Sequence, residues 1–433
     1  MKTLAIISEY NPFHNGHLYM LNKAKELTGA DYAISLMSGN FTQRGIPAIC
    51  DKHKRAHMSV ISGIDLCLEL PFVYASGSAY DFANGAINIL NSLNTVDYLC
   101  FGAECDDIDL FNKAAEIITN EPVQYKEVLK ESLKSGNSYP CARQTAITQA
   151  LKYCFDSTKD PDYENISEKI SEITSRPNNI LALEYLAALK RTNSDIKPVI
   201  IKRKTANYAD ETINNSISSA NAVRKAVANL NTKEEIIKTL ENDMPREALD
   251  ILAENFKIEF PVSSNALMPF LQSGLLNPGM LSEDICDINE AFTNKLLKAN
   301  LYSDYEGFIK NMKSKDITET RINRIILHLI TGYSNKDRKL FYDNGTAFYA
   351  GILAFRKSSS NLIKEINNNS KIPVITKKSD FNKYLENYPE VSFAAAKRMW
   401  ELDLTASNLY GSLLYNSFGT ELTNDYVTNI PIV

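Results

Sequence analysis

The chain has 433 residues, of which 44% are apolar and 23% are charged, a balance typical of a soluble globular protein large enough for two or three hydrophobic cores. This composition excludes a disordered tail protein and a fibrous protein. The 47 basic and 52 acidic residues give a net charge of -5, so no overall positive field attracts nucleic acid. Any contact with RNA must therefore use a local patch.

The seven cysteines are an odd number without a C-x-x-C pair, which indicates reduced thiols rather than a disulfide framework. The apolar run at residues 4–7 is too short for a secretory leader. No stretch approaches the roughly 20 apolar residues of a membrane span. We therefore expect a cytoplasmic protein with no membrane partner.

Short apolar runs alternate with helix-period segments over the first hundred residues, as in βαβ units with a parallel sheet. The runs predict strands at residues 4–7, 32–37, 64–70 and 98–101, with a last strand at 199–202. Most of the gap between these last two strands has helical patterns, at residues 108–135, 145–155 and 178–191. The prediction is an α/β fold, a doubly wound, Rossmann-like parallel sheet with a helical insertion at about residues 106–197.

Helical patterns continue through the second half of the chain, at residues 233–240, 246–254, 317–330 and 392–400. One short strand-like piece interrupts them at residues 372–376. We expect two domains, with residues 1–228 forming the sheet domain and residues 229–433 a mostly helical domain.

Four of the five histidines lie within the first 57 residues, and two of them, His14 and His17, follow the first predicted strand. The carboxyl edge of a parallel sheet is where doubly wound folds bind ligands. A helix that starts there offers free N–H groups and a positive dipole end to phosphate. Two imidazoles beside Gly16 can hold phosphate oxygens and stabilise charge that develops during attack on phosphorus.

Two other interpretations of these histidines stay open. A metal pair is one, although the sequence supplies no further histidine or cysteine at a spacing that completes a zinc site. Exposed turn histidines without a role are the other. The second pair, His53 and His57, lies in a charged segment behind Asp51, where we expect the solvated face of a helix capped by that aspartate.

The motif at residues 9–17, EYNPFHNGH, which we name the signature turn, resembles the H-x-G-H signature of the nucleotidyltransferase superfamily. Together with MSGNFTQRG at residues 37–45, it resembles the tRNA(Met) cytidine acetate ligase family more narrowly. The similarity extends through ELP at 69–71, FGAE at 101–104 and RPNNIL at 176–181. It covers the N-terminal half closely, and the total length suits the family.

This resemblance implies an enzyme that uses ATP to activate acetate as acetyl-adenylate and then acetylates N4 of the wobble cytidine, position 34, of elongator tRNA(Met). Magnesium is implied with ATP, without an assignable protein ligand. His14 and His17 would be catalytic. The ATP site would include Ile7, Ser8, Glu9, Tyr10, Asn11, Pro12, Phe13, His14, Asn15, Gly16, His17, Leu18, Tyr19 and Met20, with Gly102, Asn179 and Arg203 contributing from later segments.

The segment SSANAVR at residues 218–224 resembles the second phosphate motif of the superfamily, in which Ser218 would cap a helix and Arg224 would contact phosphate oxygens. A plain cap with an exposed arginine is the alternative. Asn221 stands where the family usually has threonine, and Ala209 lies in a segment that lacks the family's usual histidine. The basic strand end around Arg203 can equally be a solvated one.

Gln43 and Arg44 follow the second predicted strand and are candidates to orient acetate or the incoming cytosine; a loop shaped by its glycines is the alternative. Between Lys310 and Lys357 the chain has ten basic and four acidic residues. That stretch predicts a tRNA surface, or else a solvated helical face. Its candidate contacts are Arg321, Arg324, Arg338 and Lys339.

The primary hypothesis is therefore an ATP-dependent ligase that acetylates tRNA. Two alternatives stay open, namely a nucleotide- or RNA-binding protein on an inactive nucleotidyltransferase scaffold and an adenylyltransferase for a small cofactor precursor. The large second domain disfavours the small substrate, and the complete set of His14, Gly16, His17 and Arg224 disfavours an inactive scaffold.

Overall fold

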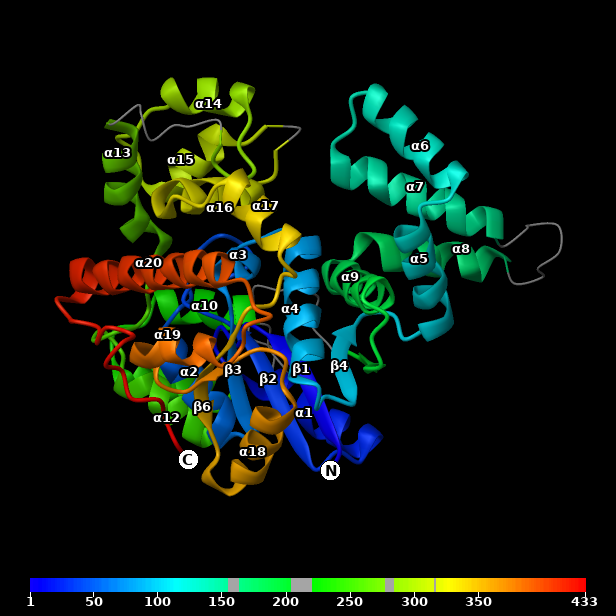
Figure 1. Cartoon of the computed structure of the whole chain (residues 1–433). Helices are drawn as coiled ribbons and strands as arrows, with labels where there is room; N and C mark the ends of the chain where they lie inside the picture. The colour runs from blue at the N-terminus through cyan, green and yellow to red at the C-terminus, as the bar shows by residue number, and fades with distance from the viewer. Residues whose placement is uncertain (155–162, 204–219, 277–283, 315–316) are drawn as a thin grey trace. The chain divides into compact units, whose positions relative to one another are not determined.

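The computed structural model describes residues 1–154, 163–203, 220–276, 284–314 and 317–433 (Figure 1). The chain forms two compact units. The first comprises Met1–Val96 with Thr205–Val433, and the second comprises Asp97–Lys204.

In the described part of the first unit, five strands lie in the order β1 (Thr3–Ser8), β2 (Tyr32–Ser38), β3 (Leu66–Leu70), β6 (Ala350–Phe355) and β7 (Val374–Ile375). The first three are parallel to one another, β6 is antiparallel to β3, and β7 is parallel to β6. Nearly all residues of these strands are buried, which explains their continuous apolar runs.

Helices α1 (Asn15–Thr28) and α2 (Lys52–Ile61) connect these parallel strands. Gly29 is the C-cap of helix α1. Its φ of 60° is a left-handed conformation that glycine adopts without the strain that a Cβ would cause. Asp51 caps α2 by accepting from the His53 N–H, as the sequence predicts. Parallel strands joined by helices confirm the predicted fold class.

The second unit holds a parallel pair, β4 (Tyr98–Ala103) and β5 (Lys197–Lys202), and the described residues between them form five helices. The helices are α5 (Ile108–Asn120), α6 (Val123–Lys134), α7 (Tyr139–Cys154), α8 (Tyr163–Ser175) and α9 (Pro177–Arg191). The single helix expected at residues 108–135 is wrong, because Glu121 adopts a φ of 43° and Pro122 follows it.

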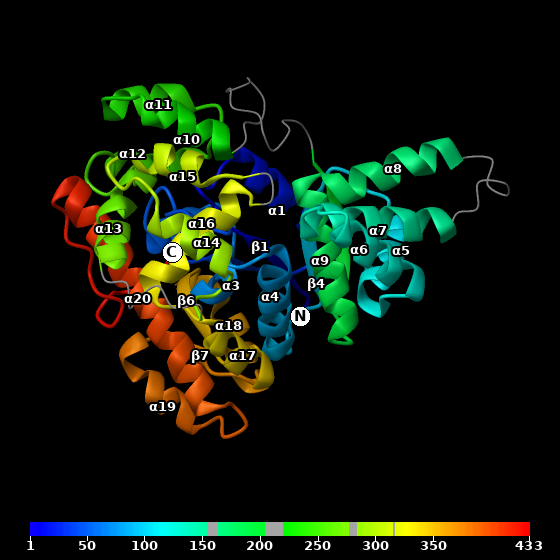
Figure 2. The same ribbon diagram turned by 90° about the horizontal axis from the view of Figure 1, so that it is seen from above.

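The remaining helices belong to the first unit. They are α3 (Phe72–Ala75), α4 (Ala79–Leu93), α10 (Ala220–Ala228), α11 (Lys233–Leu240), α12 (Arg246–Glu254), α13 (Met268–Leu276), α14 (Glu290–Leu297), α15 (Tyr305–Met312), α16 (Glu319–Thr331), α17 (Asn335–Asp343), α18 (Ser360–Asn369), α19 (Phe381–Glu386) and α20 (Phe393–Phe418). Figure 2 shows α10, α11 and α12 grouped together, and α12 packs against α2.

Strand β6 is absent from the sequence prediction, which treats the second half of the chain as mostly helical. The run from Phe348 to Phe355 is continuously apolar, a pattern that fits a buried strand as well as a buried helix. The structure pairs it with β3, so distant parts of the chain share one sheet. The compact units divide near residues 97 and 204. The division after residue 228 stays a prediction about function.

All seven cysteines are free thiols. Over the residues that the structure describes, no helix has the length and hydrophobicity required to cross a membrane.

Candidate functional site

The signature turn joins β1 to α1, and its two histidines fix each other through the backbone. His14 is the N-cap of α1, and its Nδ1 accepts from the Gly16 N–H at 3.0 Å. His17 Nδ1 accepts from the His14 N–H at 3.2 Å. A neutral imidazole that accepts at Nδ1 carries its proton on Nε2. Both rings are therefore arranged to donate from Nε2, the role that an anionic ligand requires.

Aromatic packing holds these rings in place. The His14 and His17 ring centroids lie 3.8 Å apart with an interplanar angle of 32°. Tyr10 meets His17 edge to face at 4.9 Å. Burial raises the pKa of Tyr10 to about 12, so its phenol stays neutral and supports the site by packing.

The expectation of free N–H groups at the start of α1 is wrong for its first two residues. The Asn15 N–H donates to the Asp243 carbonyl at 2.7 Å, and the Gly16 N–H donates to His14. Asn15 also donates from its side-chain amide to the Asn242 carbonyl at 2.9 Å. The first two N–H groups of α1 are therefore already used within the protein.

Arg224 lies beside the signature turn, as the second phosphate motif implies. Its guanidinium donates to the Asn11 carbonyl at 2.9 Å and to Asn221 Oδ1 at 3.3 Å. The unusual Asn221 thus orients Arg224. Ser218 and Ala209 lie outside the described residues.

The loop after β2, residues 38–51, also meets the signature turn. The Gln43 N–H donates to Glu9 Oε1 at 2.8 Å, and the Ile49 N–H donates to Asn11 Oδ1 at 2.7 Å. Gly45, at a φ of 72°, packs so closely on the α16 backbone that a Cβ there would clash. Half-buried Gln43 and Arg44 are therefore held in the same part of the unit as His14 and His17.

Gly102, Asn179 and Arg203 come together within the second unit. Gly102 pairs with Ile201 near the carboxyl ends of β4 and β5, and Arg203 follows β5 in an exposed position. Asn179 is fully buried, and its Oδ1 accepts from the N–H groups of Glu104 and Cys105 at 2.8 and 3.3 Å. Asn179 thus shapes the turn after β4. Its contact with ATP stays a prediction.

The four candidate tRNA contacts differ in their surroundings. Arg338 pairs with Asp81 at 2.8 Å, and Arg321 donates to the Asp287 carbonyl at 3.3 Å. Burial lowers the pKa of Arg324. Lys339 is the most exposed, with 76% of its side chain accessible, and pairs with Asp343. Of the four, Lys339 best fits a surface that meets phosphates.

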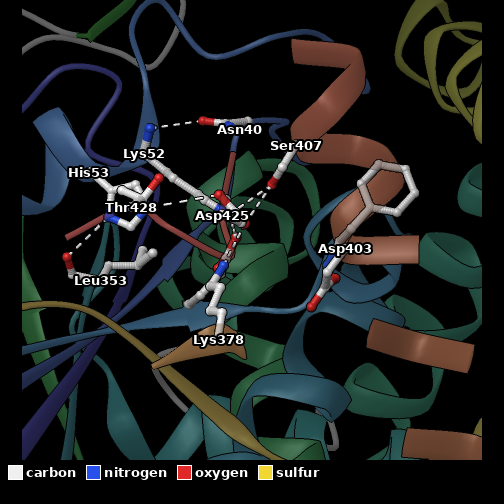
Figure 3. A network of polar contacts seen from close by, with 12 residues as sticks. Asn40, Lys52, His53, Leu353, Lys378, Asp403, Ser407, Asp425 and Thr428 are labelled. Atoms are coloured by element: carbon white, nitrogen blue, oxygen red, sulfur yellow. Dashed lines mark hydrogen bonds and ion pairs between the residues drawn. The ribbon is translucent and has the colours of Figure 1, made fainter. Parts of the chain in front are cut away.

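The prediction that this segment of α2 is a solvated face is wrong for Lys52 and His53, because both are buried. His57 is partly exposed. Lys52 Nζ contacts Glu69 and Asp425, each at 2.7 Å, and Ser407 Oγ at 2.9 Å (Figure 3). We name Lys52, Glu69, Lys378, Ser407 and Asp425 the buried ion cluster.

Lys378 completes this cluster, at 2.9 Å from Glu69 and 2.6 Å from Asp425, so two cations balance two carboxylates (Figure 3). Burial alone would raise the pKa of Asp425, but Lys52 and Lys378 outweigh it and hold the pKa below its usual range. Burial lowers the pKa of the neighbouring His53. No local pattern in the sequence indicates the cluster, because its members lie up to 373 positions apart.

A second group, Cys286, Asp287 and His328, has ligand-type atoms within 4.8 Å of one another. His328 Nδ1 lies 3.3 Å from the Cys286 carbonyl oxygen. A carbonyl oxygen can only accept, so Nδ1 carries the proton in this hydrogen bond. The other ring nitrogen, Nε2, lies 3.3 Å from Ser76 Oγ. Both ring nitrogens therefore have protein partners, and the group does not fit a metal centre.

The model of the family described as HIGH Nucleotidyl Transferase matches residues 1–425. A tRNA(Met) cytidine acetate ligase of Acetivibrio thermocellus is 37% identical over 438 residues, covering all of both chains. A protein of the same name from a Thermoanaerobacter species is 39% identical and covers 96% of each chain.

Two solved structures share the fold. The apo crystal structure of Thermotoga maritima TmcAL superposes with a TM-score of 0.91 at 29% identity, covering 100% of both chains. A second crystal form, bound with alpha-thio ATP, has a TM-score of 0.88 at 29% identity and covers 100% of this chain and 99% of that one.

Proposed function

The chain belongs to the HIGH nucleotidyl transferase family and, within it, to the tRNA(Met) cytidine acetate ligases, and from this we propose how it acts. It is an enzyme that uses ATP to activate acetate and transfers the acetyl group to N4 of the wobble cytidine, position 34, of elongator tRNA(Met). The observation that carries the proposal is the pair of Nε2 donors, His14 and His17, beside Arg224.

Adenylation solves the chemical difficulty of using acetate as an acyl donor. A carboxylate oxygen of acetate attacks the α-phosphorus of ATP, and the bond to the bridging oxygen breaks to release pyrophosphate. The cytidine N4 amine then attacks the carbonyl carbon of acetyl-adenylate, loses a proton, and displaces AMP. These steps require positioning and charge stabilisation rather than a protein nucleophile.

The two imidazoles donate to oxygens at the phosphorus under attack, where negative charge develops. Both are neutral in the arrangement described, because each accepts a backbone N–H at Nδ1. Arg224, whose guanidinium donates to the Asn11 carbonyl, supplies a full positive charge to oxygens of the departing pyrophosphate. Gln43 and Arg44 orient acetate or cytosine from the loop after β2.

Magnesium accompanies ATP in this proposal. When bound, it neutralises phosphate charge, and it usually takes one or two protein carboxylates besides phosphate oxygens. Asp243 fits that requirement, since it is buried and its Oδ1 has no hydrogen-bond partner in the described structure. Its carbonyl accepts from the first N–H of α1. Mg²⁺ should increase the affinity of the wild-type protein for the nucleotide, and this increase should be smaller in Asp243→Asn.

We place tRNA on the basic stretch between Lys310 and Lys357, within the C-terminal domain proposed for residues 229–433. Lys310, Lys313 and Lys336 are exposed along it together with Lys339. The tRNA substrate implies that the protein works in the cytoplasm.

The experiment that tests this function uses purified protein with transcribed elongator tRNA(Met), ATP and labelled acetate. Digestion of the tRNA and mass spectrometry should find one N4-acetylcytidine, at position 34, formed only when acetate and ATP are both present. A small cofactor precursor adenylated instead, or nucleotide binding without turnover, would support the alternative functions.

A further inference from the structure

Arg55 is a completely buried arginine in helix α2, and its side-chain hydrogen bonds within the described residues all go to backbone carbonyl oxygens. Its Nε donates to Cys50 at 3.0 Å, and one terminal nitrogen donates to Glu9 at 2.6 Å and Ser38 at 3.2 Å. The other terminal nitrogen donates to Gly39. Hydrogen bonds from a charged donor are stronger than neutral ones, so these contacts fix the backbone around the guanidinium firmly.

These acceptors belong to the two segments from which the proposed site is built. Glu9 directly follows β1 and begins the signature turn, whereas Ser38 and Gly39 lead from β2 into the loop of residues 38–51. Strands β1 and β2 are parallel neighbours up to the pair Ser8 and Met37. Arg55 therefore bridges them at the carboxyl edge of the sheet, just beyond their last backbone pairing.

The backbone beside this bridge is strained. Tyr10 has a φ of 42°, which is unfavourable for a residue with a Cβ and persists only where the surroundings enforce it. Arg55 holds the Glu9 carbonyl on one side, and Arg224 holds the Asn11 carbonyl on the other. Beyond Tyr10, the same turn continues to His14.

We propose that Arg55 is a positioning residue, which sets the signature turn and the loop of residues 38–51 at the separation that the first half-reaction requires. The inference rests on the proposed function, which assigns the nucleotide to the turn and acetate or cytosine to the loop, and here we take acetate as the ligand of the loop. The Glu9 carboxylate adds a second bridge by accepting from the Gln43 N–H. Arg55 itself touches neither substrate.

Arginine suits this position because its planar fork reaches several carbonyls at once, whereas lysine offers a single ammonium on a flexible stem. Arg55→Lys should therefore retain part of the bridge, and Arg55→Met should retain none. Loss of the bridge misplaces two reactants relative to each other without removing a group that binds either. The expected result is a lower kcat with little change in nucleotide affinity.

The test measures acetate-dependent exchange of pyrophosphate into ATP at saturating substrates, together with the Kd of a non-hydrolysable ATP analogue. We expect kcat to fall about 10- to 100-fold in Arg55→Met and less in Arg55→Lys, with the Kd within about threefold of wild type. Val60→Ala is the matched control. It removes fully buried apolar volume from the same helix and leaves every hydrogen bond of Arg55 in place.

The variants are compared at temperatures where all of them are folded. If kcat is equal in Val60→Ala and in the arginine variants, Arg55 has only a structural role and the proposal is contradicted. If Arg55→Met does not fold, the folded Arg55→Lys protein decides. A wild-type protein without acetate-dependent exchange contradicts the proposed function instead, so the two failures are distinguishable.

Discussion

His17 caps the helix that His14 begins, so the same two side chains that would contact phosphate also hold the backbone that carries them. His17 Nδ1 accepts from the His14 N–H, and the two tilted rings lie with their centroids 3.8 Å apart. The capping and the proposed catalysis thus depend on one tautomer, with each proton on Nε2.

His17→Ala should reduce acetyl-adenylate formation by about 10²- to 10³-fold, the usual effect of removing a preorganised donor. Loss of its capping bond should cost only about 0.5–2 kcal/mol of stability. Single-turnover formation of acetyl-adenylate and thermal unfolding separate the two effects. Lys23→Ala, on the same helix, is the control and should change neither. Near wild-type synthesis by folded His17→Ala protein would remove this histidine from the mechanism.

Asp403 predicts a measurable dependence of stability on pH. Burial raises its pKa to about 7, while Tyr349 Oη and the Phe72 N–H donate to its two oxygens at 2.6 and 2.7 Å. An unfolded aspartate titrates near 3.9, so the folded state binds the proton more tightly. This contribution is complete below about pH 4 and is lost as pH rises to about 7, by at most ~4 kcal/mol.

Asp403→Asn tests this linkage, since asparagine mimics the protonated acid. Stability of the wild type relative to this variant should decline between pH 4 and 7, measured by denaturant unfolding at several pH values. A constant difference across that range would show that Asp403 titrates normally.

The buried ion cluster should make the fold sensitive to a single uncompensated charge. Lys52→Met leaves Glu69, Lys378 and Asp425 with a net negative charge inside the protein and should cost about 3–5 kcal/mol. Adding Glu69→Gln restores neutrality, so the double variant should lose less than the sum of the two single variants. Lys126→Met, in an exposed pair with Glu121, is the control and should cost less than about 1 kcal/mol. Additive losses would contradict a coupled cluster.

Neutralising Arg321, Arg324, Arg338 and Lys339 together should weaken tRNA binding and leave acetate-dependent pyrophosphate exchange intact. Each lost phosphate contact should flatten the slope of log K against log salt by roughly 0.7 to 0.9. Arg338 is paired with the buried Asp81, whereas Lys339 and its partner Asp343 are both exposed. We therefore expect Lys339→Gln to change this slope more than Arg338→Gln.

The control for this surface neutralises Lys126, Lys130 and Lys134, which are exposed on α6 of the second unit. An equal loss of tRNA affinity in this control, or an unchanged salt slope in the quadruple variant, would move the RNA surface away from the basic stretch.

The sequence predicts those features that depend on local pattern. Apolar runs locate β1 to β5, and the spacing of His14, Gly16 and His17 identifies the signature turn before its geometry is known. Pairing between strands that lie far apart in the chain is harder to predict from the sequence. Strand β6 joins β3 from about 280 positions away, and its apolar run has no alternation that distinguishes it from a helix.

The burial of charged side chains is also hard to predict, because their partners lie far away in the chain. Lys52 and Arg55 lie in a segment whose composition is typical of a solvated helix, yet both are completely buried. Lys52 forms an ion pair with Asp425, from the far end of the chain. The guanidinium of Arg55 donates hydrogen bonds to carbonyl oxygens of two separate segments. The residue pattern of a single helix does not indicate partners from other parts of the chain. Strands, helix caps and the local motif can therefore be predicted from the sequence, whereas the buried charged groups that position them cannot.

The most direct test of the central claim is exchange of labelled pyrophosphate into ATP, measured with and without acetate and in the absence of tRNA. Acetyl-adenylate formation is reversible while the intermediate stays bound, so the wild-type protein should show exchange that requires acetate and is lost in His17→Ala. Absence of exchange with acetate, or exchange that proceeds equally without it, would contradict activation of acetate at the signature turn.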